Sequence, residues 1–284
     1  MTTDEILRYS AFTSHPSGGN PAGVVLDATH LDPQQMLAIA AEVGYSETAF
    51  VTGRDEAARR YRLRYFSPLA EVPFCGHATV ATAAALADRT GTGELTFDTP
   101  AGEIRVATDT DEAGVSRATL TSAPTHSRPA GDDEVDETLA LLGWTREDLD
   151  PAFPPHVAFG GNEHLVLTTG SRARLAALDY DFDGLAAVMR ARGWTTVMLV
   201  WRESERVFHA RNPFPVGGVV EDPATGAAAA AFGGYLRAVD AVREPVTVQI
   251  RQGEDMGRPS ELLIAVDPAD ARVRVTGRAV PITA

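Results

Sequence analysis

Side chains that can move protons gather in two short segments of the chain. The first, EVPFCGHAT at residues 71–79, holds Cys75 and His77, and the second, EDPATG at residues 221–226, holds Asp222. Thiol, imidazole and carboxyl groups act as general acids and bases once their surroundings tune their pKa. The two segments therefore predict proton-transfer chemistry.

A third acid, Glu47, lies in GYSETAF at residues 44–50, between a predicted helix and an apolar strand. Taken alone, such an acid is most simply an exposed loop residue. Placed against apolar neighbours, its pKa would rise and it could act as a general base, with Ser46 and Thr48 to orient it.

The other candidates also have plainer interpretations. His77 could be a first-turn residue making a local hydrogen bond, and Asp222 could simply cap a helix. Cys75 could be a small buried residue, which is the common fate of a free cysteine. Alternatively, a thiol just before a helix N-terminus can have a depressed pKa and act as an acid or base.

Both segments lead into alanine-rich runs that predict buried helices over 77–88 and 226–238. Gly76 and Gly226 begin them, about half the chain apart, which suggests two similar halves. The first N–H groups of a helix lack intrahelical acceptors and carry partial positive charge, so they can hold an anion. We expect the two helix N-termini to cradle a substrate carboxylate.

The remaining pattern is many short strands and few helices, which predicts an α+β fold. A helix that is apolar nearly all round is usually buried on every side. The sequence therefore predicts a strand-rich domain wrapped around one buried helix, present twice. The stretch 124–133, rich in Pro, Ser, Gly and Asp, is the best candidate for a linker.

Composition excludes several functional classes. The chain has 284 residues and a net charge of −14, which would repel nucleic acid, and it has no basic amphipathic stretch for a membrane surface. All 25 basic residues are arginines, so a Schiff-base lysine is excluded. A single cysteine excludes an internal disulfide. With no signal-like N-terminus and no apolar run near a membrane span, we expect a cytoplasmic protein.

Several ordered motifs make the sequence similar to the phenazine-biosynthesis isomerase (PhzF-like) family of the diaminopimelate epimerase superfamily. The resemblance covers nearly the whole chain. It rests on Phe12 and on the segments GNPAGVV (19–25), SETAF (46–50), RYFSP (64–68), EVPFCGHAT (71–79), EDPATG (221–226), QG (252–253) and GRPS (257–260).

The resemblance implies two pseudo-symmetric domains, each a strand barrel around a central helix, with the active site between them. We expect these domains at 1–120 and 121–271, with the final strand, 272–284, packing back onto the first. The resemblance also implies isomerisation by proton transfer without a metal or organic cofactor, and commonly a homodimer.

In the reaction that gives the family its name, trans-2,3-dihydro-3-hydroxyanthranilate is isomerised to a ketone. The family's catalytic residues fall on Glu47, His77 and Asp222. The expected substrate-binding residues are Asn20, Cys75, Gly76, Gly226 and Ala227. Alanine at position 227 departs from the family's pattern, which has serine there. We therefore expect proton-transfer chemistry from this chain, while the missing hydroxyl indicates that its preferred substrate can differ from trans-2,3-dihydro-3-hydroxyanthranilate.

Two other functions stay open at this point. The protein could be an amino-acid or hydroxy-acid racemase or epimerase using Cys75 together with Glu47 or Asp222. The lack of a second cysteine argues against a mechanism with two thiols. It could also be a non-catalytic protein that binds carboxylates, although binding alone would not require all three candidate catalytic residues.

Overall fold

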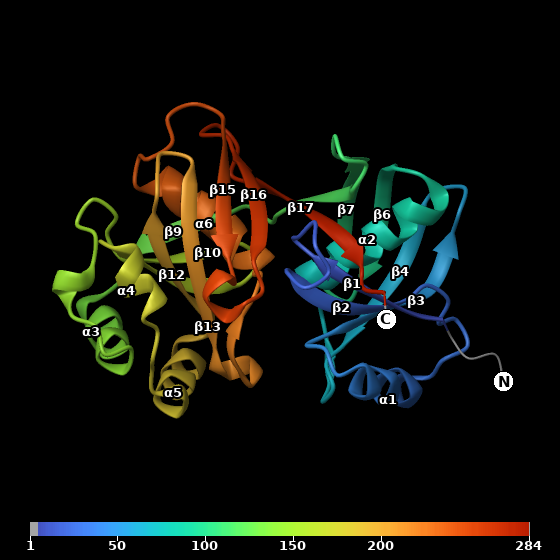
Figure 1. Cartoon of the computed structure of the whole chain (residues 1–284), viewed down its shortest axis with the longest axis horizontal. Helices are drawn as coiled ribbons and strands as arrows, with labels where there is room; N and C mark the ends of the chain where they lie inside the picture. The colour runs from blue at the N-terminus through green and yellow to red at the C-terminus, as the bar shows by residue number, and fades with distance from the viewer. Residues whose placement is uncertain (1–4, 284) are drawn as a thin grey trace. The chain divides into compact units, whose positions relative to one another are not determined.

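The computed structural model describes residues 5–283, which form two compact units (Figure 1). Unit 1 comprises residues 5–121 and 276–283, and unit 2 comprises residues 122–275. No helix among these described residues is both long and apolar enough to cross a bilayer.

Unit 1 is a closed barrel of antiparallel and parallel strands. In order around the barrel, the paired strands are β17, β1, β2, β3, β4, β6, β7 and β8, and β8 pairs again with β17. The elements are β1 (Ile6–Ala11), β2 (Asn20–Val25), α1 (Pro33–Val43), β3 (Thr48–Asp55), β4 (Arg60–Phe66), β5 (Glu71–Val72), α2 (Gly76–Thr90), β6 (Gly93–Thr99), β7 (Gly102–Thr110), β8 (Ser116–Thr121) and the end of β17 (Val273–Pro281).

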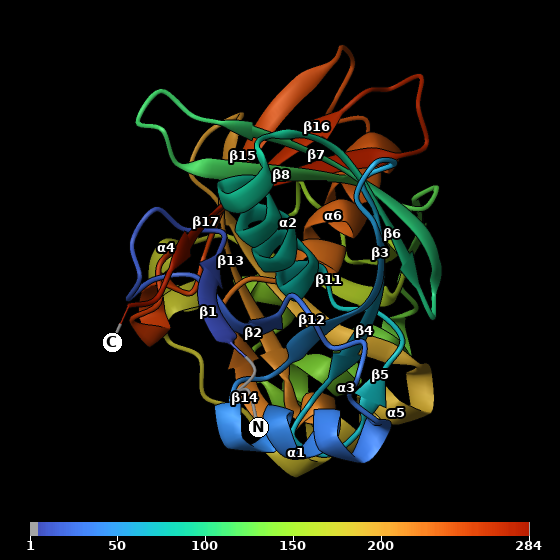
Figure 2. The same cartoon turned by 90° about the vertical axis from the view of Figure 1, so that its right-hand side faces the viewer.

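Helix α2 fills this barrel. It contacts β1, β2, β3, β7 and β8, and every residue from His77 to Ala87 is buried. Figure 2 shows α2 with the strands of unit 1 around it. The alanine side chains are small enough for the strands to approach the helix backbone from all sides, which explains why a helix without a polar face is stable here.

Unit 2 also builds a strand layer around one helix. Its paired strands run in the order β9, β10, β11, β12, β13, β15 and β16, with β14 added to β13. The elements are β9 (His126–Pro129), α3 (Asp132–Leu141), β10 (His156–Phe159), β11 (Glu163–Thr169), α4 (Arg172–Ala176), α5 (Phe182–Arg192), β12 (Trp194–Arg202), β13 (Val207–Phe214), β14 (Val219–Asp222), α6 (Gly226–Ala238), β15 (Val246–Gln252), β16 (Ser260–Val266) and short 3₁₀ turns at Arg146–Asp148, Pro215–Gly217 and Glu254–Met256.

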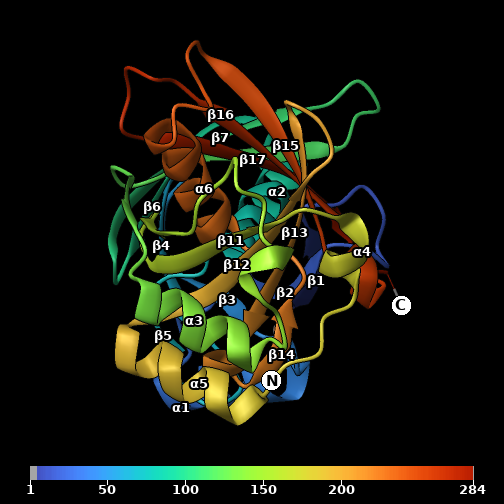
Figure 3. The ribbon, with the colours of Figure 1, turned by 90° about the vertical axis from the view of Figure 1, so that its left-hand side faces the viewer.

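Helix α6 packs against the inner side of this layer, in contact with β9, β10, β11 and β16. On the other side, α3, α4 and α5 cover the strands, as Figure 3 shows, through an apolar cluster that includes Leu139, Leu165, Leu185 and Leu199. The predicted α+β architecture, a strand layer around a buried helix in each half, is confirmed.

The predicted linker at 124–133 is wrong in part. Residues His126–Pro129 form strand β9, which pairs antiparallel with β10. Strand β10 itself follows a proline-rich stretch and was not predicted. Both strands are short and take their hydrogen bonds from strands elsewhere in the chain, β9 from β10 and β10 from both β9 and β11, so local composition did not reveal them.

Candidate active site

Glu47 is positioned by the start of strand β3. Helix α1 ends at Gly44 in the left-handed conformation, with φ of 72°. The Gly23 N–H of β2 donates to the Glu47 carbonyl at 3.2 Å, and Gly23 pairs with Thr48 in register. A side chain at Gly23 would place its Cβ 2.6 Å from Thr48 Oγ1, so glycine allows this close approach. The backbone of Glu47 is thereby fixed against β2.

Cys75 and His77 are positioned by the start of helix α2. Cys75 is the N-cap residue, and its side chain makes no capping hydrogen bond to the described part of the chain. Gly76 and His77 follow in the first turn. Because the first-turn N–H groups of a helix have no intrahelical acceptor, this end of α2 can bind an anion.

The structure brings Glu47, Cys75 and His77 together. His77 Nε2 lies 3.4 Å from Glu47 Oε2. The Cys75 thiol can donate to the same carboxylate oxygen at 3.5 Å, and its sulfur lies 3.3 Å from His77 Nδ1. Ser46 Oγ is also 3.3 Å from His77 Nε2. We call Glu47, Cys75 and His77 the acid–base trio.

Two members of the acid–base trio are shielded from solvent, and the third is partly accessible to it. Cys75 and His77 are buried, whereas the Glu47 side chain is 18% exposed. These contacts are longer than strong hydrogen bonds, and catalytic contacts commonly shorten when a ligand binds. A carboxylate with one exposed edge beside an imidazole and a thiol can accept a proton from a substrate and pass it on.

Asp222 lies in unit 2, at the end of β14 and opposite Asn212 of β13. It is not the N-cap residue of α6. The N-cap residue is Thr225, whose hydroxyl instead donates to Asp222 Oδ2 at 2.6 Å. As in α2, the side chain of the N-cap residue makes no capping hydrogen bond in the described structure, and the first N–H groups of α6, at Gly226 and Ala227, can bind an anion.

Gln252 organises the loop before α6. Its side-chain amide donates to the Asp222 carbonyl at 2.6 Å and to Thr225 Oγ1 at 3.0 Å. In return, Gln252 Oε1 accepts from the Thr225 N–H at 3.2 Å. Sequence reasoning noted Gln252 only as part of a motif and assigned it no role. In the sequence, the only sign that Gln252 has a structural role is that it stands before Gly253 in the QG motif.

Asn20 begins β2, is buried, and pairs with Ala11 of β1. Its place on the strand beside β3 is compatible with the predicted substrate-binding role, which stays a prediction.

A buried polar chain runs across the strands of unit 2 that face α6. His164 Nδ1 lies 2.8 Å from Thr196 Oγ1, which donates to Asn212 Oδ1 at 2.9 Å. His164 must therefore carry its proton on Nδ1. Complete burial lowers its pKa to about 3, so this imidazole is neutral at physiological pH.

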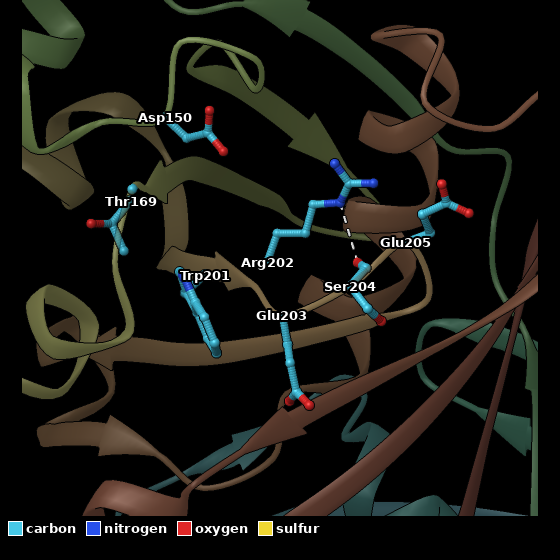
Figure 4. A pocket seen from close by; sticks show the side chains of 8 residues that line it. Asp150, Thr169, Trp201, Arg202, Glu203, Ser204 and Glu205 are labelled. Atoms are coloured by element: carbon cyan, nitrogen blue, oxygen red, sulfur yellow. Dashed lines mark hydrogen bonds between the residues drawn. The ribbon is translucent and has the colours of Figure 1, made fainter.

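Unit 2 also carries an open hollow of about 480 Å³. Figure 4 shows it around the turn after β12, where the Arg202 Nε donates to the Ser204 carbonyl at 3.2 Å. Its lining contains none of the predicted site residues; it consists of Asp150, Thr169, Gly170, Trp201, Arg202, Glu203, Ser204 and Glu205. We therefore do not assign the reaction to this hollow.

The family model described as "Phenazine biosynthesis-like protein" (PhzC-PhzF) matches residues 9–284. The chain belongs to the phenazine biosynthesis-like family. One curated relative is the "Uncharacterized isomerase YddE" of Escherichia coli K12. It is 31% identical to this chain, and the match covers 97% of this chain and 95% of the relative. The trans-2,3-dihydro-3-hydroxyanthranilate isomerase of Pseudomonas aeruginosa PAO1 is 32% identical over 93% of this chain and 90% of its own.

Solved structures agree with this assignment. The phenazine biosynthesis protein of the PhzF family from Bacillus anthracis superposes with a TM-score of 0.88 at 27% identity, covering 100% of this chain and 98% of that one. A probable proline racemase from Agrobacterium radiobacter K84 shares the fold, with a TM-score of 0.66 at 13% identity over 98% and 90% of the two chains. Our phenazine biosynthesis-like chain is an isomerase with the epimerase-type fold.

Proposed function

We propose that this isomerase moves a proton between two carbons of a small carboxylate substrate, and that trans-2,3-dihydro-3-hydroxyanthranilate is the first substrate to test. The observation that carries the proposal is the Glu47 carboxylate, 3.4 Å from the His77 imidazole beside the uncapped start of α2. The Pseudomonas relative named for this substrate supports the choice.

In this mechanism Glu47 is the base. Its carboxylate takes a proton from a substrate carbon, and the electron pair of the broken C–H bond moves into the adjoining double-bond system. The protonated Glu47 then returns the proton to another carbon, so the reaction has no net consumption of acid or base. His77 polarises the substrate or holds the Glu47 proton between the two steps. General acid–base catalysis of this kind contributes roughly 10²–10⁴-fold.

Binding of the carboxylate falls to backbone groups. The N–H groups at Gly76 and His77 lie next to the base, and those at Gly226 and Ala227 offer a second set, with Asn20 as an additional polar contact. Asp222, held by Thr225 at 2.6 Å, is assigned as a further acid–base group. Positioning by these groups supplies the part of the rate that proton transfer alone does not.

The test is proton NMR of trans-2,3-dihydro-3-hydroxyanthranilate in D₂O with the wild-type protein and with Glu47→Gln. We expect conversion and ring-proton exchange with the wild type, and a loss of about 10²-fold or more in the variant. Glu42→Gln, on the exposed side of α1, is the matched control and should behave as wild type. Asp222→Asn should also lower turnover.

If Glu47→Gln converts the compound as fast as the wild type, Glu47 is not the base. If the folded wild type neither converts the compound nor exchanges its protons, this substrate is wrong, and other amino-acid and hydroxy-acid carboxylates should be screened by the same exchange assay.

The distance between Cys75 and Glu47 bears on whether these two residues could be the paired bases of a racemase. Two bases on opposite faces of one carbon each need to be about 3–3.5 Å from it, and so stand roughly 6–7 Å apart. Cys75 Sγ and Glu47 Oε2 are 3.5 Å apart, which fits a shared side rather than opposite sides. This arrangement disfavours Cys75 with Glu47 as the two opposed bases of a racemase. If Cys75 is nevertheless a racemase base, Cys75→Ala should abolish Cα-proton exchange of amino or hydroxy acids.

We further propose, on the family resemblance, a cytoplasmic homodimer. Light scattering coupled to gel filtration would test the dimer, and a monomer at micromolar concentration would contradict it.

A further inference from the structure

The buried polar chain of unit 2 ends at an amide group that lacks a partner for its donor. Asn212 of β13 is 0% exposed and accepts from Thr196 through Oδ1, while its Nδ2 makes no hydrogen bond to any described residue. A buried donor without a partner costs free energy, and such groups are rare in folded proteins. We propose that Asn212 is a positioning residue for Asp222, to whose carboxylate its Nδ2 donates a hydrogen bond. The role of Asp222 itself rests on the proposed function.

Strand register places these two side chains next to each other. Asn212 lies directly opposite Asp222 in the antiparallel pair of β13 and β14. Side chains opposite each other in such a pair project from the same face, with Cβ atoms about 4.5–5.5 Å apart. At that spacing, a rotation of the Asp222 side chain brings a carboxylate oxygen within hydrogen-bond distance of Nδ2.

The opposite face of the same strand pair holds this register. Arg211 Nε donates to Glu221 Oε2 at 2.9 Å, and a second bond joins Arg211 Nη2 to Glu221 Oε1. Arg211 Nη1 also donates to the Ala176 carbonyl at 2.7 Å. Both charged side chains are 8% exposed. Because this buried ion pair fixes β14 against β13, it keeps Asp222 opposite Asn212.

His164 and Thr196 orient the Asn212 amide group. His164 Nδ1 lies 2.8 Å from Thr196 Oγ1, whose hydroxyl donates to Asn212 Oδ1 at 2.9 Å. Oδ1 is thereby turned towards β12, which pairs with one edge of β13, whereas β14 pairs with the other. The Nδ2 donor is left for the side that carries Asp222. A reversed amide would present Oδ1 on that side and repel a carboxylate.

Burial decides between a binding role and a positioning role. A substrate cannot reach the fully buried Asn212 amide, whereas Asp222 is half-buried. A carboxylate has lone pairs for about four hydrogen bonds, so Asp222 can accept from Asn212 as well as from Thr225, which donates at 2.6 Å. A hydrogen bond to a charged group is stronger than one between neutral groups, and it fixes the direction in which the carboxylate faces.

The first test is a double-mutant cycle of Asn212→Ala and Asp222→Ala, measured by turnover of trans-2,3-dihydro-3-hydroxyanthranilate. In the wild-type background, we expect Asn212→Ala to lower kcat about tenfold with little change in KM, because a hydrogen bond to a charged group is lost. In the Asp222→Ala background, the same change should lower kcat less than about twofold, since the group that it positions is gone.

A milder variant and a matched control accompany the cycle. Thr196→Val removes only the hydroxyl that orients Asn212, and it should lower kcat about threefold. Thr138→Val removes another fully buried hydroxyl of unit 2, which donates to the Glu134 carbonyl at 2.8 Å, and it should leave kcat unchanged. If Asn212→Ala does not fold, Thr196→Val takes its place in the cycle with Asp222→Ala.

Urea unfolding of the four proteins in the cycle tests the contact without any substrate. We expect the two single changes to be non-additive by at least about threefold in the unfolding equilibrium constant. Independent effects on unfolding, or equal kcat losses for Asn212→Ala in both backgrounds, would overturn the positioning role. If the wild type does not convert the compound, the proposed substrate is wrong, and the unfolding cycle alone decides whether Asn212 and Asp222 interact.

Discussion

Ala227 shows how one side chain can tune substrate preference without altering the fold. It lies in the first turn of α6, half-buried, at the position where the family resemblance leads us to expect a serine. Its backbone N–H can still bind an anion, so the change removes only a hydroxyl. The chemistry assigned to Glu47 and His77 does not depend on that hydroxyl.

We therefore expect Ala227→Ser to raise kcat/KM for trans-2,3-dihydro-3-hydroxyanthranilate by up to about tenfold, since a hydrogen bond of this kind contributes ~0.5–1.5 kcal/mol. Steady-state kinetics would measure it. The fully buried neighbour is the control: Ala228→Ser should give no gain and should lower stability. An unchanged or lower kcat/KM for Ala227→Ser would mean that the natural substrate differs from this compound.

Gln252 acts on the loop before α6 through its side-chain amide, which joins the Asp222 carbonyl to Thr225. We expect Gln252→Ala to destabilise unit 2 by about 2 kcal/mol, because the buried Gln252 side chain is removed and its partly buried partners lose hydrogen bonds. It should also lower kcat more than it raises KM, since the Asp222 carbonyl and the Thr225 hydroxyl that holds the Asp222 carboxylate both lose a hydrogen bond. Gln249→Ala, at a half-exposed position of the same strand, is the control for denaturant unfolding and kinetics. An unchanged kcat would rule out a positioning role for Gln252.

At the scale of elements, the turn after β10 depends on Gly160. A Cβ there would lie 2.5 Å from the Ala231 nitrogen and 2.7 Å from the Ala227 carbonyl, both in the backbone of α6. Glycine thus allows the sheet to touch the helix at the same end that carries the proposed anion-binding N–H groups.

Gly160→Ala should cost about 3 kcal/mol, because backbone atoms cannot move aside as a side chain would. The matched control is Gly170→Ala, where the nearest atom to the new Cβ, the Asp148 carbonyl oxygen, is 3.9 Å away. That change should alter stability by less than about 1 kcal/mol. Urea unfolding of both variants would check the difference, and equal losses would contradict the packing argument.

At the scale of the whole molecule, the chain has many more carboxylates than arginines, and ion pairs with arginines reduce the repulsion among the carboxylates. Glu134 is one well-buried example, at 8% exposure, with Arg128 at 2.8 Å. The hydrogen bond from Arg128, followed by the Gly131 N–H, lowers the pKa of Glu134 from 4.5 to about 2. The ionised form is therefore favoured in the folded state.

A lowered folded-state pKa stabilises the protein above the ordinary pKa and loses that contribution as the pH falls. Glu134→Gln should thus cost about 2 kcal/mol at pH 7, after allowing for the half-exposed Arg128. The difference between wild type and variant should shrink from about pH 4.5 towards pH 2. Thermal unfolding across this range would measure it, and a difference independent of pH would contradict the ion pair's contribution. Asp136→Gln, which replaces an exposed carboxylate of the same helix, should show a much smaller cost.

The sequence by itself determined the features that depend on local signals. The helices predicted at 77–88 and 226–238 appear as Gly76–Thr90 and Gly226–Ala238, because alanine favours helix and the polar, glycine-bearing segments mark where each run begins. The family motifs, ordered along the chain, likewise identified the isomerase class. Residue types alone also named Glu47, Cys75 and His77 as candidates.

Only the tertiary structure decided how those candidates meet. Strands β3 and β4 lie between Glu47 and His77 in the sequence. The parallel pairing of β2 with β3 nevertheless brings the Glu47 carboxylate to the start of α2, beside His77. The same holds for β9 and β10, which form because they pair with each other and because β10 also pairs with β11. It holds too for Gln252, whose hydrogen-bond partners Asp222 and Thr225 are distant in the sequence. Contacts between distant segments depend on packing and register, which no short stretch of sequence encodes.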